Sequence, residues 1–218
     1  ETKVDVHSDG EIGELAASIR EMSDNLKLSQ QREKKLAYFD QLTGLPNRFS
    51  LRQQLDKLIR QSERNGQQFA TMFIDLDDFK KINDALGHHL GDRLLQEAAD
   101  RIRTNLRAGD VMTRDSSDDD TPQNMLARLG GDEFTVLLTS IHGAHNASRV
   151  AKRILIALAE PFQLQNHQAY VGASIGISIF PGDGSSAEQL LKNADVAMYE
   201  AKKSGKNNFQ YFSSAMNA

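Results

Sequence analysis

A pair of glycines between two apolar runs is the feature that most restricts the fold of this chain. Gly130 and Gly131 separate two strand-like stretches. Because glycine adopts positive φ at little cost, this pattern predicts a tight β-hairpin turn. The acids Asp132 and Glu133 follow at once, and side chains on successive strand positions point to opposite faces. A turn that brings bare backbone and carboxylates to one point suits a triphosphate with its metal ions, although an ordinary hairpin turn is the competing interpretation.

A second acidic site follows an apolar run over residues 69–75, which ends in Asp75. Such a run predicts a buried strand, and Lys80 follows shortly after it. An acid at a strand end, acids on a hairpin and a nearby lysine fit Mg²⁺-dependent phosphoryl transfer, because Mg²⁺ takes oxygen ligands from carboxylates and substrate phosphates. Taken alone, Asp75 could instead cap a helix. The combination of acids and lysine favours the metal interpretation.

Composition limits the function classes. A length of 218 residues allows one substantial domain plus an appendage. A formal charge of −4 argues against a general nucleic-acid-binding face. The absence of cysteine excludes a thiolate metal site and suits a reducing compartment. No 18-residue apolar run or signal-peptide pattern is present, and the chain begins without Met, so we expect a non-spanning piece of a longer protein.

The N-terminal residues 12–39 are predicted to form a helix. Apolar residues recur in steps of three and four, as in the seam of a coiled coil, at Ile12, Leu15, Ile19, Met22 and Leu26. The same register places Ser29 and Glu33 in the seam, so packing should weaken there. The alternative is a single amphipathic helix that lies on its own domain.

The remainder predicts alternating helices and strands, and therefore a central sheet with helices packed on it. After the hairpin at 125–139 and the strand at 69–75, the expected helices are 47–64, 77–84, 91–107, 144–159 and 185–204, and the further strands are 168–180 and 208–212. The polar, acidic stretch 115–124 is expected to be an exposed loop. Cation binding is the alternative interpretation of that loop.

Five motifs occur in order that together resemble the GGDEF family, the diguanylate cyclases. They are residues 40–48, DQLTGLPNR; the segment 75–92; residues 130–134, GGDEF; residues 173–178, ASIGIS; and residues 194–207, ADVAMYEAKKSGKN. The resemblance covers about residues 37–212. It implies synthesis of cyclic di-GMP from two GTP molecules. It also implies an α/β (α+β) fold with a ferredoxin-like βαββαβ core, in which a mainly antiparallel sheet is flanked by helices as in nucleotidyl cyclase and palm domains.

The resemblance assigns a metal site for Mg²⁺ or Mn²⁺. Its ligands would be Asp75, Asp132, Glu133 and the Leu76 carbonyl. Glu133 is also a candidate acceptor of the attacking hydroxyl proton, and the sequence does not divide these two roles. Lys80 would stabilise phosphate charge.

The resemblance also assigns substrate contacts. Lys202 and Lys206 match a triphosphate-binding pair and, four residues apart, would share one helical face if the helix continues that far. Decoration of a helix end is the alternative. Asn83 and Asp92 match guanine-reading positions, where a carboxylate can accept from guanine N1–H, which adenine lacks. His88 matches a nucleotide contact, with a structural role as the alternative.

A product-inhibition site is expected at Arg107 and Asp110, an Arg-x-x-Asp pattern. At the spacing usual in the family the chain has Thr121 and Asn124, which lack the required groups. An insertion over 115–124 that bulges outward would leave the earlier pair in place. The alternative is that Arg107 and Asp110 only form a charged helix end followed by a turn.

The flanking segments resemble parts of signalling proteins. Residues 8–15 resemble the start of the second helix of a HAMP relay, and residues 211–218 resemble a linker to an EAL phosphodiesterase domain. We therefore expect a HAMP-like signalling helix over 1–36, a catalytic domain over 37–213 and the start of a linker over 214–218. The expected assembly is a homodimer joined through the N-terminal helix, in the cytoplasmic part of an inner-membrane receptor. A non-catalytic GTP-binding module and a pure dimerisation module are the competing functions.

Overall fold

The computed structural model describes residues 11–107, 124–141 and 143–217. The chain divides into two units, residues 1–38 and 39–218. The first described element, α1, is a single helix over Glu11–Tyr38, which confirms the predicted N-terminal helix.

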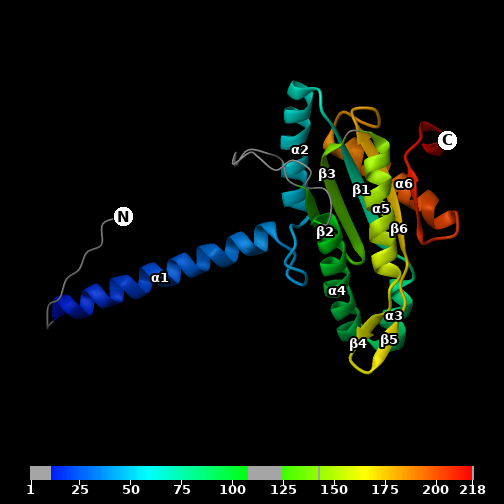
Figure 1. Ribbon diagram of the computed structural model, residues 1–218. Coiled ribbons are helices and arrows are strands. Elements are labelled where there is room, and N and C mark those ends of the chain that lie inside the picture. The colour runs from blue at the N-terminus through cyan, green and yellow to red at the C-terminus, as the bar shows by residue number, and fades with distance from the viewer. Residues whose placement is uncertain (1–10, 108–123, 142, 218) are drawn as a thin grey trace. The chain divides into compact units, whose positions relative to one another are not determined.

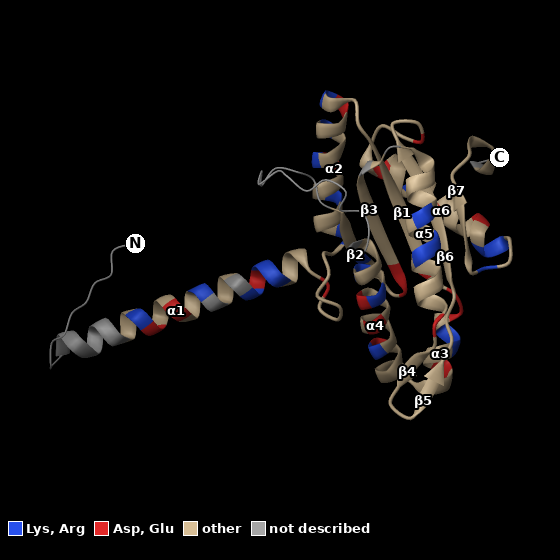
Figure 2. Cartoon of the chain, in the orientation of Figure 1, with Lys and Arg blue, Asp and Glu red and all other residues tan. Residues whose placement is uncertain are grey.

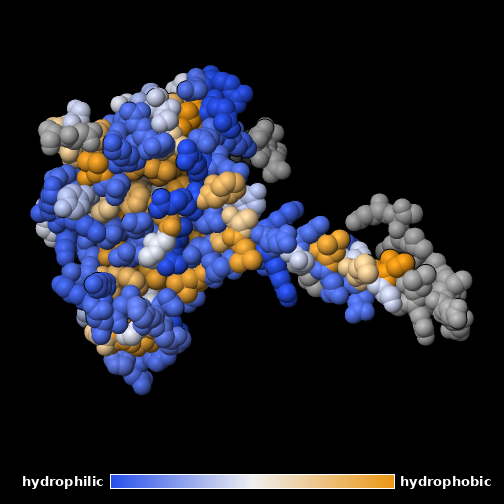
Figure 3. All heavy atoms as spheres, turned by 180° about the vertical axis from the view of Figure 1, so that it is seen from behind, coloured by the Kyte–Doolittle hydropathy of each residue, from blue (hydrophilic) through white to orange (hydrophobic). Residues whose placement is uncertain are grey.

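Helix α1 exposes apolar side chains at the predicted seam positions. The exposed fractions of Ile19, Met22 and Leu26 are 58%, 72% and 59%, and apolar patches follow one another along this helix in Figure 3. Lys and Arg are interspersed with Asp and Glu along α1 (Figure 2). None of the described helices combines the length and apolar character that a membrane crossing requires.

The second unit is built on a five-stranded sheet with the order β2-β3-β1-β6-β7 (Figure 1). Its strands are β1 Gln68–Leu76, β2 Met125–Gly130, β3 Glu133–Ile141, β6 Ala173–Phe180 and β7 Asn208–Tyr211. The pairs β1–β3, β1–β6 and β2–β3 are antiparallel, and only β6–β7 among the pairs of this sheet is parallel. This is the expected mainly antiparallel, ferredoxin-like arrangement.

Helices cover both faces of this sheet. The described helices of this unit are α2 Arg48–Asn65, α3 Phe79–Leu86, α4 His88–Arg107, α5 Ala144–Ala159, α6 Ala187–Lys203 and a short 3₁₀ turn, Ser214–Asn217. Alternate residues of β1 point to opposite faces. Met72 and Ile74 pack in the core with residues of α4 and α5, whereas Phe69 packs with α2 and Phe73 with α6. One face is therefore covered by α4 and α5, and the other by α2 and α6.

The prediction of one strand over 168–180 was wrong. A small hairpin, β4 Phe162–Leu164 with β5 His167–Ala169, precedes β6. Gly172 lies between β5 and β6, and its carbonyl accepts a hydrogen bond from the Asp77 N–H at 2.9 Å. A Cβ at Gly172 would lie 3.1 Å from Oδ2 of Asp77, so a larger residue there would crowd that carboxylate.

Candidate active site

The site begins where β1 ends. Asp75 is register partner of Glu133 across the β1–β3 ladder, and such partners share one face of a sheet. Asp75 is only 7% exposed and alternates with Phe73, so both carboxylates lie on the face covered by α6. The residue that precedes α3 is Asp78. The helix-cap alternative for Asp75 is therefore wrong.

Asp132 lies within the hairpin turn and not, as the sequence suggested, on the strand that follows it. Gly130 still pairs with Glu133, so the two-residue turn consists of Gly131 and Asp132. The φ angles of Gly130 and Gly131 are 139° and 53°, which explains why both are glycine. Asp132 thus lies in the turn rather than on β3. Its carbonyl accepts from the Leu76 N–H at 3.3 Å, which joins the turn to the end of β1.

Helix α6 brings a cation to the acids. Lys202 Nζ lies 2.7 Å from Oδ1 of Asp75. The helix does not continue to Lys206, so the two lysines do not share a helical face: α6 ends at Lys203, and Lys206 has a φ of 61°. Lys206 Nζ instead contacts Oδ2 of Asp78 at 2.8 Å. Both lysines nevertheless lie beside acids of the segment 75–78.

Carboxylates are crowded at this edge. Burial raises the pKa of Asp75 to about 6; Asp132 adds to the rise, whereas the hydrogen bond from Lys202 opposes it. Burial also raises the pKa of Glu133, which Arg48 and Lys202 lower and Asp195 raises. Negative charge at this edge is therefore only partly compensated by side chains.

This excess of negative charge suits a divalent cation. Within the described residues, no group of three or more His, Cys, Asp or Glu side chains is already gathered as a metal centre. Mg²⁺ commonly uses one or two carboxylates and completes its coordination with phosphate oxygens and water. The candidate ligands Asp75, Asp132, Glu133 and the Leu76 carbonyl fit that mode, since all lie at the joined ends of β1 and the hairpin.

Asp77 stabilises the backbone around the site through its hydrogen bonds, a role that the sequence analysis did not assign. Its carboxylate accepts from Ser174 Oγ at 2.7 Å and from the Asn207 N–H at 2.9 Å. These bonds join β1, β6 and the segment after α6. Asp77 therefore fixes the backbone next to Lys206 rather than facing a substrate.

The predicted guanine-reading residues come together on α3 and α4. A Cβ at Gly91 would lie 1.8 Å from Oδ1 of Asn83, so glycine lets Asn83 reach α4 beside Asp92. That Oδ1 atom is buried without a hydrogen-bond partner. Asp92, His88 and Lys80 are exposed. The exposed Asp92 is thus available to a ligand on the same helix pair that holds Asn83.

The predicted product-inhibition site falls largely outside the described residues. Arg107 is the last residue of α4, whereas Asp110 and most of the 115–124 loop lie in the undescribed segment 108–123. That site stays a prediction.

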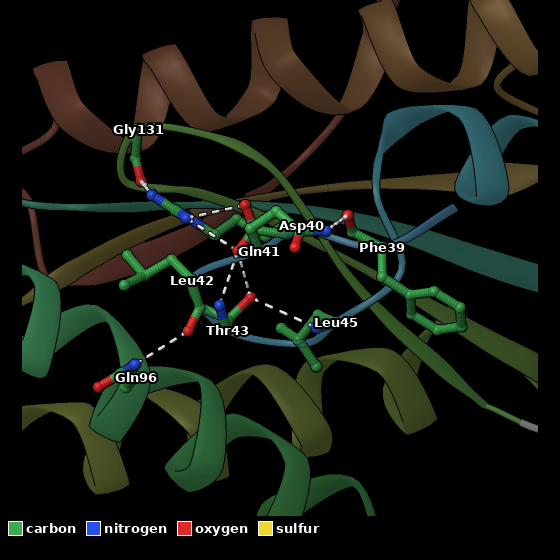
Figure 4. A network of polar contacts seen from close by, with 9 residues as sticks. Phe39, Asp40, Gln41, Leu42, Thr43, Leu45, Gln96 and Gly131 are labelled. Carbon is green, nitrogen blue, oxygen red and sulfur yellow. Dashed lines mark hydrogen bonds and ion pairs between the residues drawn. The ribbon is translucent and has the colours of Figure 1, made fainter. Parts of the chain in front are cut away.

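Sequence reasoning missed two arginines. Arg48, the first residue of α2, lies 4.0 Å from Glu133. Arg128, on β2, holds both Asp40 and the Gly131 carbonyl (Figure 4). Arg48 belongs to the recognised motif 40–48, whereas Arg128 lies two positions before the glycine pair, outside the motif 130–134.

The end of β1, with Asp75 opposite Glu133, the hairpin turn held against it and two lysines nearby, has the features expected of a phosphoryl-transfer site. A family model described as "Diguanylate cyclase, GGDEF domain" matches residues 37–119 and 120–208, and a HAMP domain model matches residues 1–28. The chain therefore belongs to the GGDEF family of diguanylate cyclase domains.

Curated relatives agree with this membership. The bifunctional diguanylate cyclase/cyclic di-GMP phosphodiesterase MucR of Pseudomonas aeruginosa is 42% identical over 94% of this chain and 28% of its own length. The diguanylate cyclase TpbB of the same species is 37% identical over 84% of this chain and 38% of its own. NbdA, a cyclic di-GMP phosphodiesterase, is 40% identical over 83% of this chain and 21% of its own. The chain thus spans less than half of each relative.

Solved structures agree with the fold. The GGDEF domain of TpbB aligns with a TM-score of 0.74 and 34% identity, over 83% of this chain and 97% of that one. The coiled coil and GGDEF domain of DgcB from Caulobacter crescentus, in complex with c-di-GMP, aligns with a TM-score of 0.74 over 93% of this chain and all of that one. At 21% identity, the second likeness supports the fold alone.

Proposed function

We propose that this chain condenses two GTP molecules into cyclic di-GMP. The observation that carries the proposal is the register pair Asp75 and Glu133, with Lys202 on Asp75 and the turn residue Asp132 beside them. In each of two steps, the 3′-oxygen of one GTP attacks the α-phosphorus of the other. The bond from that phosphorus to the bridging oxygen breaks, its electron pair leaves with pyrophosphate, and the 3′-hydroxyl proton must be accepted.

The protein contributes positioning and charge complementarity rather than covalent chemistry. Glu133 is half-buried with a raised pKa, which suits an acceptor of the hydroxyl proton. Lys202, Lys206 and Lys80 would balance triphosphate charge. A Mg²⁺ or Mn²⁺ ion held by Asp75, Asp132, Glu133 and the Leu76 carbonyl would supply further neutralisation at the phosphates.

Guanine selectivity would come from Asn83 and Asp92. A carboxylate at Asp92 would pair with guanine N1–H and the exocyclic amine, whereas adenine lacks the N1–H donor. Asn83, whose Oδ1 lies against Gly91, would supply a second polar side chain on the same helix pair.

Each subunit would bind one GTP, so two copies must face each other for the reaction. The exposed apolar residues of α1 favour a coiled-coil homodimer that sets how often the two sites meet. The HAMP match supports a signalling role for residues 1–36, and we infer a membrane-anchored parent with this chain on its cytoplasmic side.

A second candidate is a GTP-binding module without turnover that regulates a neighbouring phosphodiesterase domain. The relative NbdA, named only as a phosphodiesterase, favours this candidate. The complete set of site acids favours catalysis.

The test is incubation of the chain with GTP and Mg²⁺, with ATP in a parallel reaction, followed by chromatography. We expect cyclic di-GMP from GTP only, with a specific activity that rises with protein concentration until dimers are complete. Equal specific activity of a chain lacking residues 1–35, when monomeric and dilute, would contradict the requirement for two facing sites.

A further inference from the structure

Arg128 lies next to the turn of Gly131 and Asp132, and all three of its guanidinium nitrogens donate hydrogen bonds within the protein. Its residue is 9% exposed. Nη1 donates to both carboxylate oxygens of Asp40 at 2.9 and 3.0 Å. Nε and Nη2 donate to the Gly131 carbonyl at 3.1 and 2.7 Å (Figure 4). One planar guanidinium therefore joins a carboxylate to the backbone of the turn.

Asp40 is itself held rigidly. Its Oδ1 accepts from the Thr43 N–H at 2.9 Å and from Thr43 Oγ1 at 2.6 Å. The Asp40 N–H donates to the Leu45 carbonyl at 2.8 Å. The segment that contains Asp40 is also tied to β2, because the Arg128 N–H donates to the Pro46 carbonyl at 3.0 Å. Asp40 thus fixes the guanidinium from a preformed loop.

The consequence falls on the two-residue turn. The carbonyl of Gly131 is held by Arg128, and the carbonyl of Asp132 is held by the Leu76 N–H. With both carbonyls fixed, the direction in which the Asp132 side chain leaves the backbone is fixed as well. Glu133, the next residue, inherits the same constraint.

We propose that Arg128 and Asp40 are positioning residues for the catalytic turn, which makes the segment directly after α1 part of the active-site machinery. The inference rests on the proposed cyclase reaction. A buried ion pair is weak evidence for stability, because its desolvation cost offsets much of its attraction. Its worth here lies in geometry, since a displacement of about 1 Å can cost about 10²-fold in rate.

The location of the pair gives the inference a further consequence. Helix α1 ends at Tyr38, and Asp40 follows two residues later. A change in the path of the chain at the end of α1 therefore has a short covalent route to the guanidinium that holds Gly131.

The test compares Arg128→Lys and Asp40→Asn with a matched control, Arg101→Lys, all in the complete chain. Lysine keeps the charge but loses the fork, and asparagine keeps the shape of aspartate. Arg101 is a comparable arginine, because its guanidinium also makes several contacts within the protein. It ion-pairs with Glu97 at 2.6 Å, donates to the carbonyls of Ala157 and Pro161 at 3.0 and 2.7 Å, and lies 3.7 Å above the Phe162 ring. It serves α4, α5 and β4 rather than the turn.

The first readout is steady-state kinetics with GTP. We expect kcat to fall by about 10- to 100-fold in Arg128→Lys and Asp40→Asn, with KM changed by less than about threefold. Arg101→Lys should lower the melting temperature but leave kcat of the folded enzyme within about twofold. A similar fall of kcat in Arg101→Lys would overturn the positioning role.

The second readout is amide hydrogen exchange over residues 130–133, which does not require turnover. Exchange there should quicken in Arg128→Lys and Asp40→Asn and stay unchanged in Arg101→Lys. Unchanged exchange in the first two variants would overturn the inference. If the wild type makes no cyclic di-GMP, the proposed reaction fails, and the exchange result alone decides whether the pair orders the turn.

Discussion

At its two ends, β1 points Phe69 and Asp75 to the same face of the sheet, but the surroundings of these two side chains differ completely in chemistry. At its start, Phe69 stacks on Phe180 of β6 with ring centroids 4.9 Å apart, in the core covered by α2. At its end, Asp75 opposes Glu133 and contacts Lys202. The aromatic end gains stability from burial. The acidic end gives up stability, because burial disfavours the ionised carboxylate. One strand therefore contributes core packing at one end and, in the proposed reaction, metal-binding carboxylates at the other.

The largest effect should come from the acidic end. Asp132→Asn and Glu133→Gln should each lower turnover by about 10²- to 10⁴-fold, because in the proposed reaction each removes a metal ligand or proton acceptor. The thermal unfolding midpoint should hardly change. Product formation is measured by chromatography, with Asp100→Asn, an exposed acid on α4, as the control. Wild-type turnover in either variant would remove that residue from the site.

A change at the aromatic end should do the reverse. Phe69→Ala should lower the free energy of unfolding by about 3–5 kcal/mol, because it removes a fully buried ring and leaves a cavity. The KM for GTP of the molecules that remain folded should stay close to that of the wild type. Urea unfolding and kinetics at low temperature check the two parts. A large rise in KM without loss of stability would break the division between the two ends.

A substitution at Asp75 should have a smaller effect on stability than Phe69→Ala, and it should raise stability rather than lower it. With its pKa raised to about 6, the ionised carboxylate costs stability at neutral pH. Asp75→Asn should therefore raise the melting temperature by about 2–4 °C at pH 7.5 without divalent ions while abolishing turnover. Mg²⁺ should stabilise the wild type more than the variant. A lower melting temperature for Asp75→Asn would show that the Lys202 contact outweighs the burial cost.

The smallest effect is expected on protein stability at acidic pH, through the Asp40 carboxylate. Burial tends to raise the pKa of Asp40, but hydrogen bonds from Thr43 and Arg128 prevail and hold it below its ordinary value of 3.8. A depressed carboxylate pKa contributes stability that is complete above 3.8 and is lost as the pH falls through the lowered value. Asp75 has the opposite sign, so its contribution grows as the pH falls from about 6 toward 3.8.

Melting temperatures between pH 7 and pH 3 separate these two contributions. The difference between wild type and Asp40→Asn should shrink below pH 4, whereas Asp75→Asn should lose its advantage already between pH 6 and pH 4. If the Asp40→Asn difference stayed constant down to pH 3, the carboxylate would not be held in its ionised form by its partners.

Much of the architecture could be predicted because its indications are local. Apolar runs predicted β1 and the hairpin, and the acid at the end of β1 was recognised as a candidate metal ligand only together with the hairpin acids and Lys80. Helix α4 begins at His88, three residues before the predicted start, because Gly87 with a φ of 85° separates it from α3. Such boundaries depend on turn conformation, which composition indicates only loosely.

What could not be predicted depends on contacts between distant residues. Asp40 and Arg128 are separated by 88 positions, and no local pattern indicates which acid a buried arginine will choose. The three-residue strands β4 and β5 are too short to show a periodic pattern. Lys206 leaves the helical face because positive φ angles at Lys206 and Asn207 turn the chain toward Asp77.

The central claim is that the acidic end of β1 performs catalysis and does not merely bind nucleotide. The most direct measurement follows GTP, pyrophosphate and cyclic di-GMP together in one reaction of the wild-type chain with Mg²⁺. We predict that one cyclic di-GMP and two pyrophosphates form for every two GTP consumed, and that Glu133→Gln retains GTP binding without product. Saturable GTP binding by a folded, dimeric wild type with no pyrophosphate release would contradict the claim and favour the regulatory module.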